Sequence, residues 1–208
     1  MNFICSVCRG RLKSLFSPCS LSGLDVRWSG GQVISRRYLG LFCDKRKRYS
    51  QQKVFGYRVE QVYSVVYHIG RYKEFLPWCI DSVVTKETEN VLHAKLEVGF
   101  PPLKESYTSV VTVKPNKSIH SISHDGWLFE HLENVWEFQP GPTSNSCIVY
   151  CGVEFEFRSH LHSQLALLCY DEIVKQMTAA FEKRCIQLYG KSNLPKDATK
   201  YIEADMKT

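Results

Sequence analysis

The 208-residue sequence has no uninterrupted apolar run of the roughly 20 residues that a membrane-spanning helix requires. The mature chain is therefore expected to be soluble or peripheral at a membrane. Cys5 and Cys8 form the only C-x-x-C motif, and no second such pair or set of spaced histidines completes a zinc site with them, so the sequence predicts no zinc site. The five cysteines after residue 50 are odd in number and lack framework spacing, which favours buried free thiols over disulfides.

Acidic residues are scarce at the start of the chain. The first fifty positions contain ten lysines or arginines and only two acids, Asp25 and Asp44, which is a net charge of +8. The remaining 158 residues contain 17 basic and 19 acidic side chains, a net charge of −2. The basic isoelectric point thus comes from the first quarter of the chain, and the folded part gives no electrostatic indication of nucleic-acid binding.

This basic, serine-rich and acid-poor start is typical of a mitochondrial transit peptide. A secretory signal would need a continuous apolar core, which Arg9, Arg11 and Lys13 interrupt. The alternative is a disordered basic tail that binds acidic partners.

The chain therefore divides into three predicted parts. Residues 1–49 are expected to be a disordered transit peptide, 50–190 a folded domain with a sizeable core, and 191–208 a flexible C-terminal tail. The sequence does not decide between cleavage of the transit peptide near Tyr38 and cleavage near Tyr49, because arginine precedes each tyrosine.

In the folded part, apolar residues recur first at the period of a strand and finally at that of a helix. Alternation is clearest over 91–100 and 148–157, where apolar residues occupy every second position. Strands are predicted over 54–59, 80–89, 91–100, 105–113, 118–124, 127–138 and 148–157, helical turns over 60–69 and 71–76, and one long helix over 159–189.

This order predicts an α+β domain with the helix-grip, START-like fold. A curved antiparallel sheet of about six to seven strands would wrap around the long C-terminal helix. If the sheet curls further than the helix fills, a dry cavity remains between them.

Residues 99–103, Gly-Phe-Pro-Pro-Leu, connect two predicted strands at a place where a polar loop is normal. Two prolines stiffen this apolar connection, and Lys104 and Glu105 follow it. Such a loop suits the mouth of a lipid pocket or a tip that touches a membrane. The alternative is a loop folded back onto its own core.

Four long motifs carry a family resemblance. They are YKEFLPWC at 72–79, LEVGFPPLKESYTSVVTV at 96–113, LFEHLENVWEF at 128–138, and FEFRSHLHSQLA continuing to DEIVKQMTAAFEKR at 155–184. Together they strongly resemble the mitochondrial coenzyme Q-binding proteins of the START-like, polyketide cyclase-related superfamily. The resemblance covers about residues 48–190.

The resemblance implies a non-catalytic protein that binds ubiquinone in an apolar cavity, with no cofactor other than this bound ligand. It also implies a lipid chaperone or carrier that supports respiratory-chain electron transfer and ubiquinone biosynthesis. Its expected place is the matrix side of the inner mitochondrial membrane, as a peripheral protein. The expected partners are ubiquinone, inner-membrane lipid and respiratory-chain or quinone-biosynthesis complexes, and not nucleic acid.

Strand parity and helix face give the candidate ligand-binding residues of the pocket and its mouth. Lys104 is the polar member, able to meet a quinone carbonyl or a lipid phosphate, although a surface lysine flanking a hairpin fits equally well. The full set is Trp78, Leu96, Val98, Phe100, Pro101, Pro102, Leu103, Lys104, Trp136, Phe155, Phe157, Leu165, Cys169, Ile173 and Met177.

A cyclase- or aromatase-type enzyme acting on an aromatic or polyketide-like substrate is the alternative, and a protein-interaction adaptor is a third class. No convergent set of His, Asp or Glu occupies inward strand positions, which counts against an enzyme. Glu154 and Glu156 share the outward face of a strand and are expected to be solvated. His160 and His162 do not face each other on a helix, so no catalytic or metal-binding residues are predicted.

Overall fold

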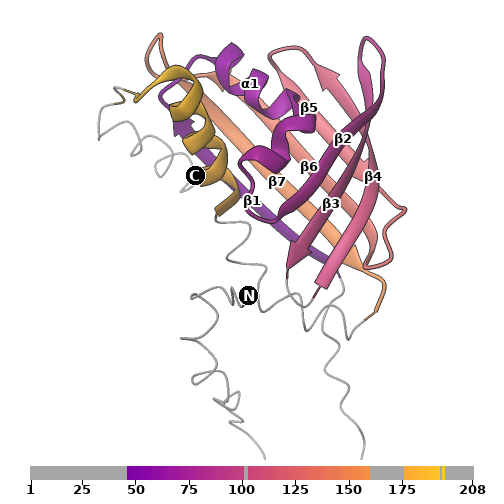
Figure 1. Ribbon diagram of the computed structural model, residues 1–208. Helices are drawn as coiled ribbons and strands as arrows, with labels where there is room; N and C mark the ends of the chain where they lie inside the picture. The colour runs from indigo at the N-terminus through magenta and orange to yellow at the C-terminus, as the bar shows by residue number, and fades with distance from the viewer. Residues whose placement is uncertain (1–45, 101–102, 160–175, 193, 195–208) are drawn as a thin grey trace, which may run out of the picture. The chain divides into compact units, whose positions relative to one another are not determined.

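The computed structural model describes residues 46–100, 103–159, 176–192 and 194 (Figure 1). In this part of the chain seven antiparallel strands form one sheet in the order β1-β7-β6-β5-β4-β3-β2. The elements are β1 (Arg46–Phe55), α1 (Val59–Tyr67), the 3-10 helix η1 (Ile69–Glu74), β2 (Cys79–Glu87), β3 (Val91–Phe100), β4 (Leu103–Lys114), β5 (Ser118–Ser123), β6 (Phe129–Pro140), β7 (Cys147–Phe157) and a helix over 176–189.

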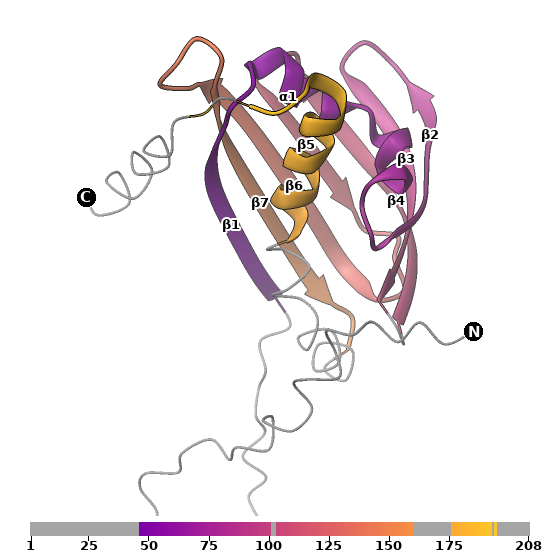
Figure 2. The same ribbon diagram turned by 60° about the vertical axis from the view of Figure 1, so that its left-hand side comes forward.

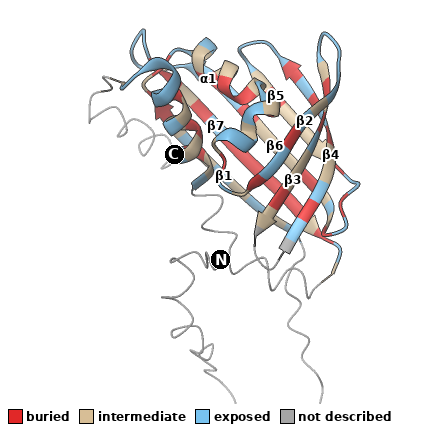
Figure 3. Cartoon of the chain, viewed as in Figure 1, coloured by how far each residue is buried: buried red, intermediate tan, exposed pale blue. Residues whose placement is uncertain are grey.

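The sheet is strongly curved, and α1, η1 and the C-terminal helix lie on its concave side (Figures 1 and 2). Alternation sets which face of each strand points there. On β7, Val149, Cys151 and Phe155 are buried while Tyr150 between them is exposed (Figure 3). The predicted helix-grip, START-like architecture is therefore confirmed.

The C-terminal helix is anchored by two fully buried side chains, Phe181 and Cys185. The ring centroids of Phe181 and Trp136 are 4.7 Å apart, so the helix packs directly on β6. Gly190 follows the last helical residue, with a left-handed φ of 84° that glycine adopts without strain. Leu188, in the last turn of the helix, is 48% exposed, so the buried face of the helix ends at Cys185.

The first strand begins earlier than the sequence pattern predicts. Residues 46–49 belong to β1, where Arg46 pairs with Glu156 and Arg48 with Glu154 of β7. The expected disorder up to residue 49 is therefore wrong for these four residues. The side chains of these four residues are mostly polar, so they show no apolar alternation that would predict a strand. This part of β1 is instead stabilised by backbone pairing to β7. The transit peptide itself stays a prediction.

Cys79, Cys147, Cys151 and Cys185 are buried free thiols, as predicted. Burial raises the pKa of the Cys147 and Cys185 thiols to about 12, so both stay protonated. None of the described helices is long and apolar enough to cross a membrane.

Candidate functional site

A cavity of about 120 Å³ lies on the concave side of the sheet, beneath η1 and the C-terminal helix. A cavity of about 150 Å³ can hold one benzene molecule, so this space is slightly smaller than a site for a single small ring. The described lining residues are Ile69, Tyr72, Leu76, Trp78, Cys79, Leu96, Val98, Tyr107, Ser109, Val111, Ile119, Ser121, Asn134, Trp136, Met177 and Phe181.

Five residues predicted from strand parity and helix face line this cavity: Trp78, Leu96, Val98, Trp136 and Met177. They come from four separate places in the chain and meet because β3, β6 and the C-terminal helix face the same space. That they contact a ligand stays a prediction.

Two predicted pocket residues, Phe155 and Phe157, lie elsewhere. Both are fully buried in a second apolar cluster with Leu128, Leu132 and Val153, and they are absent from the described cavity wall. Their face was predicted correctly, but they belong to the end of β7 beyond the cavity, where their rings pack edge to face at 4.9 Å. Strand parity fixes a face and not a position along it.

Lys104 does not line the cavity. Its side chain is 63% exposed, and its Nζ forms an ion pair of 2.7 Å with Oε1 of Glu97. Lys104 and Glu97 belong to adjacent strands close to the β3–β4 turn, so the amine stays on the outer surface. The interpretation as a surface lysine flanking a hairpin is the one that fits.

The predicted apolar loop is shorter than expected. Phe100 pairs with Leu103, so β3 and β4 extend into the predicted loop and leave only Pro101 and Pro102 between them. These prolines and the side chains of Phe100 and Leu103 lie outside the described part of the chain. The predicted helix positions Leu165, Cys169 and Ile173 also lie outside the described residues.

Four polar cavity residues were missed by the sequence analysis. Tyr107 and Ser109 are inward residues of β4, and Ser121 and Asn134 are inward residues of β5 and β6. The alternation of β4 could have found the first two, since Val111 and Val113 continue the same face. Serine and asparagine carry no apolar signal, so a hydrophobic pattern does not select them.

The described part of the cavity wall carries no charged side chain. Among its described residues there is no Asp, Glu, His, Lys or Arg. Burial raises the pKa of the Tyr72 and Tyr107 hydroxyls and of the Cys79 thiol, which keeps all three protonated at neutral pH. The Tyr72 hydroxyl donates a hydrogen bond of 2.5 Å to the Val66 carbonyl.

Glu105 is an inward, buried carboxyl that the sequence analysis treated only as a charge after the loop. It is 2% exposed, and its Oε2 accepts a hydrogen bond of 3.1 Å from the backbone N–H of Leu128. Its Oε1 has no hydrogen-bond partner and lies against Gly126. Burial raises the pKa of this carboxyl above its ordinary value. Glu105 thus holds the β5–β6 connection from inside the sheet.

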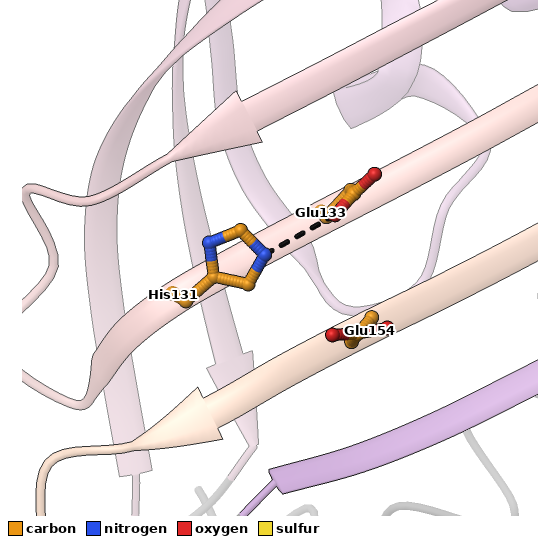
Figure 4. Close-up of side chains that lie close together, drawn as sticks. All are labelled: His131, Glu133 and Glu154. Carbon is orange, nitrogen blue, oxygen red and sulfur yellow. Dashed lines mark hydrogen bonds and ion pairs between the residues drawn. The ribbon is translucent and has the colours of Figure 1, made fainter.

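The outer face of the sheet carries a different cluster, His131, Glu133 and Glu154 (Figure 4), whose ligand atoms lie within 4.8 Å of one another. Glu133 also accepts from His120 at 2.7 Å, and this hydrogen bond lowers the pKa of Glu133. Each carboxylate already has cationic or imidazole partners, so the cluster is explained by contacts within the sheet.

Glu154 points outward, as predicted, but it is not solvated. It is only 7% exposed, because Arg46 and Arg48 of the edge strand cover its carboxylate. The hydrogen bond from Arg48 is the main reason that the pKa of Glu154 is lowered. Sequence alone does not bring β1 beside β7, which are about a hundred residues apart.

Comparison with known proteins places this geometry in a family. The sequence model of the family described as "polyketide cyclase / dehydrase and lipid transport" matches residues 55–182 of this chain. The coenzyme Q-binding protein COQ10 homologue B of Xenopus laevis, named mitochondrial, is 39% identical over 96% of this chain and 81% of its own length. The corresponding COQ10 protein of Drosophila melanogaster is 42% identical over 82% of this chain and 71% of its own length.

A solved START superfamily protein from Mycobacterium smegmatis superimposes with a TM-score of 0.60 at 16% identity, covering 68% of this chain and 98% of that one. At this sequence identity the structural similarity is evidence for the fold alone. Sequence identity, fold and cavity agree, and the chain belongs to the COQ10 family of coenzyme Q-binding proteins, within the polyketide cyclase and lipid-transport family.

Proposed function

We propose that this chain binds the ring of coenzyme Q in the described cavity and acts as a chaperone or carrier for this lipid. The observation that carries the proposal is the cavity itself, whose described wall is rich in aromatic residues and has no charged side chain, and whose size approaches that of a site for one small ring, in a chain whose relatives are named coenzyme Q-binding proteins. An uncharged ring is the ligand that an uncharged wall accepts without a desolvated charge.

The polyprenyl tail needs apolar surface beyond this cavity. Each buried methylene contributes about 0.8 kcal/mol, so a long tail favours any apolar path that the domain or a membrane offers. In this proposal the ring orients the ligand in the cavity, and the polyprenyl tail contributes most of the binding free energy.

The β3–β4 hairpin is the proposed mouth. Exposed apolar side chains flank its two strands: Ile80 is 51% exposed and reaches Gly99. Trp127 is 52% exposed, and its indole N–H donates a hydrogen bond of 3.1 Å to the Lys104 carbonyl. Tryptophan with a hydrogen-bonded indole is favoured at membrane interfaces, which supports a lipid-facing end of the domain.

Within the cell, we place this activity at the matrix side of the inner mitochondrial membrane, in support of respiratory electron transfer and ubiquinone synthesis. The mitochondrial relatives and the basic start of the chain support this location. Contact with respiratory-chain or quinone-biosynthesis complexes belongs to the same proposal.

A cyclase or aromatase is the competing function, because the fold is shared. The absence of an acid or base among the described cavity-lining residues favours binding over proton-transfer catalysis. Glu105 is an inward carboxyl, but its Oε2 is engaged by the backbone and it does not line the described cavity.

Lipid extraction from the purified protein followed by mass spectrometry tests the proposal. Ubiquinone is expected in near-stoichiometric amount with wild type. Ser109→Phe fills the cavity and should remove most of the bound quinone, whereas Thr112→Phe, on the outward face of the same strand, should not. Circular dichroism checks that both variants fold. A wild-type protein that is consistently free of quinone, even after incubation with it, would refute the proposal.

A further inference from the structure

The polar side chains of the described cavity wall lie on three adjacent strands and are here called the polar strip: Tyr107, Ser109, Ser121 and Asn134. Tyr107 and Ser109 are two residues apart on β4 and share its inward face. Ser121 pairs directly with Asn134 across β5 and β6. On its other side Ser121 pairs with Val111, which is two residues from Ser109.

Directly paired residues of one face have Cβ atoms about 5 Å apart, and diagonal neighbours about 7–8 Å. The side chains of the strip can therefore form hydrogen bonds with two or three oxygen atoms of a single ring at the same time. The surrounding wall, with Leu96, Val98 and Trp136, is apolar, so the strip fixes which edge of the ring bears those oxygens.

Every side chain of the strip can both donate and accept a hydrogen bond. Hydroxyl groups rotate to do either, and the asparagine amide offers two donors beside one acceptor oxygen. A quinone oxygen only accepts hydrogen bonds, whereas a quinol hydroxyl donates one as well. The strip can satisfy both, and the described residues of the cavity wall include no cation to compensate a ring anion.

We propose that the polar strip binds the oxidised and the reduced ring with nearly equal affinity and rejects rings that carry a negative charge. This inference rests on the proposed function and adds to it the redox and charge specificity of the site. The protein would carry quinone and quinol alike and leave the potential of the bound couple close to that of the free one. A tenfold preference for one form would shift that two-electron potential by about 30 mV.

Calorimetric titration under anaerobic conditions tests the proposal directly, with ubiquinone bearing one isoprene unit and with its quinol. The two dissociation constants of wild type are expected to agree within about threefold. 4-Hydroxybenzoate, a ring of similar size with a carboxylate, should not bind at a hundred times that concentration. A preference of tenfold or more for either redox form, or binding of the carboxylate with similar affinity, would overturn it.

Two substitutions of Asn134 give the residue-level test. Asn134→Leu removes both hydrogen-bonding roles and should weaken quinone and quinol alike by about tenfold. Asn134→Asp, assayed at a pH where its carboxyl is ionised, leaves acceptors only, so it should weaken the quinone by at least tenfold and the quinol much less. Asn145→Leu and Asn145→Asp, in the exposed turn before β7, are the matched controls and should bind as wild type.

The outcomes separate the two proposals. If wild type binds neither ring, the proposed function fails together with this inference. If wild type binds both rings and both folded Asn134 variants bind them equally well, the strip plays no part while quinone binding stands. Ser121→Ala, which removes the hydroxyl of the residue that faces Asn134 across β5 and β6 with little change in volume, gives the same distinction should an Asn134 variant fail to fold.

Discussion

Arg48 donates a hydrogen bond through Nε to Oε2 of Glu154, 2.5 Å away, across the pairing of β1 with β7. Arg46 donates to the other carboxylate oxygen, so one buried acid receives two arginines from the edge strand. Both arginines lie in a stretch whose composition resembles a presequence. The folded domain therefore begins before residue 50, at the start of β1.

This relationship predicts where processing can occur. A chain that starts at Ser50 loses both arginines and the first four residues of β1, leaving Glu154 covered by no cation. Its melting temperature should be lower by about 5 °C than that of a chain that starts at Leu41, as measured by scanning calorimetry. N-terminal sequencing of the mature protein should find a first residue before Arg46. Equal melting temperatures, or a mature start at Ser50, would contradict this prediction.

Glu105 predicts a pH dependence of stability. Its folded pKa is raised by burial, so the folded state binds more protons than the unfolded one. The stability linked to this carboxyl is fully present below the unfolded pKa and is lost as the pH rises through the folded pKa. Glu105→Gln cannot titrate, so urea unfolding should show the variant gaining stability relative to wild type between pH 4 and pH 7. Glu137→Gln, at an exposed position of β6, is the control and should follow wild type at every pH.

We predict that position 126 must be glycine, because the Glu105 carboxylate occupies the space that a side chain there would need. A Cβ at this position would overlap Oε1 of Glu105, and Gly126 is buried in the β5–β6 connection. Gly126→Ala should cost about 1–3 kcal/mol in the free energy of unfolding, the usual effect of overpacking. Gly70→Ala, where nothing lies within 4 Å, should change stability far less. If Glu105 is the obstacle, Glu105→Ala should make the alanine at 126 less costly in a double-mutant cycle.

The hairpin end of the domain is predicted to contact lipid. Trp127→Gln and Leu103→Asp should each reduce co-sedimentation with neutral phospholipid vesicles by at least fivefold, because each removes an apolar group from the proposed interface. Tyr150→Asp, on the outer face of β7, is the exposed aromatic control. Thermal unfolding checks the fold of each variant. If Leu103→Asp unfolds the domain, position 103 is core; if Trp127→Gln binds vesicles as well as wild type, the hairpin end is not the contact.

Much of the architecture was predictable because it depends on local periodicity. The alternation of β3 and β7 predicted their bounds within a residue or two and the inward face of each. Asp125-Gly126 lies in the β5–β6 connection and Gly190 at the end of the last helix, places where such residues commonly occur. These signals survive in a single sequence because a half-buried strand or helix must repeat apolar residues at its own period.

Residues of the site were less predictable, since a pocket selects by position as well as by face. Leu96, Val98 and Trp136 were found by parity, but Phe155 satisfied the same rule and lies in a second cluster. The polar residues of the wall have no hydrophobic signature at all. Only the curvature of the sheet decides which inward side chains border a space and which fill it.

By itself, the sequence determined the order of strands and helices, the inward face of each strand, and the family, because periodicity and long motifs are properties of the chain alone. The tertiary structure decided what distant segments do when they meet. It buried Glu105 beneath a connection twenty residues away, covered Glu154 with two arginines from the other end of the domain, and joined four uncharged polar residues into one strip. Burial and electrostatic environment arise from neighbours in space, and sequence periodicity does not encode them.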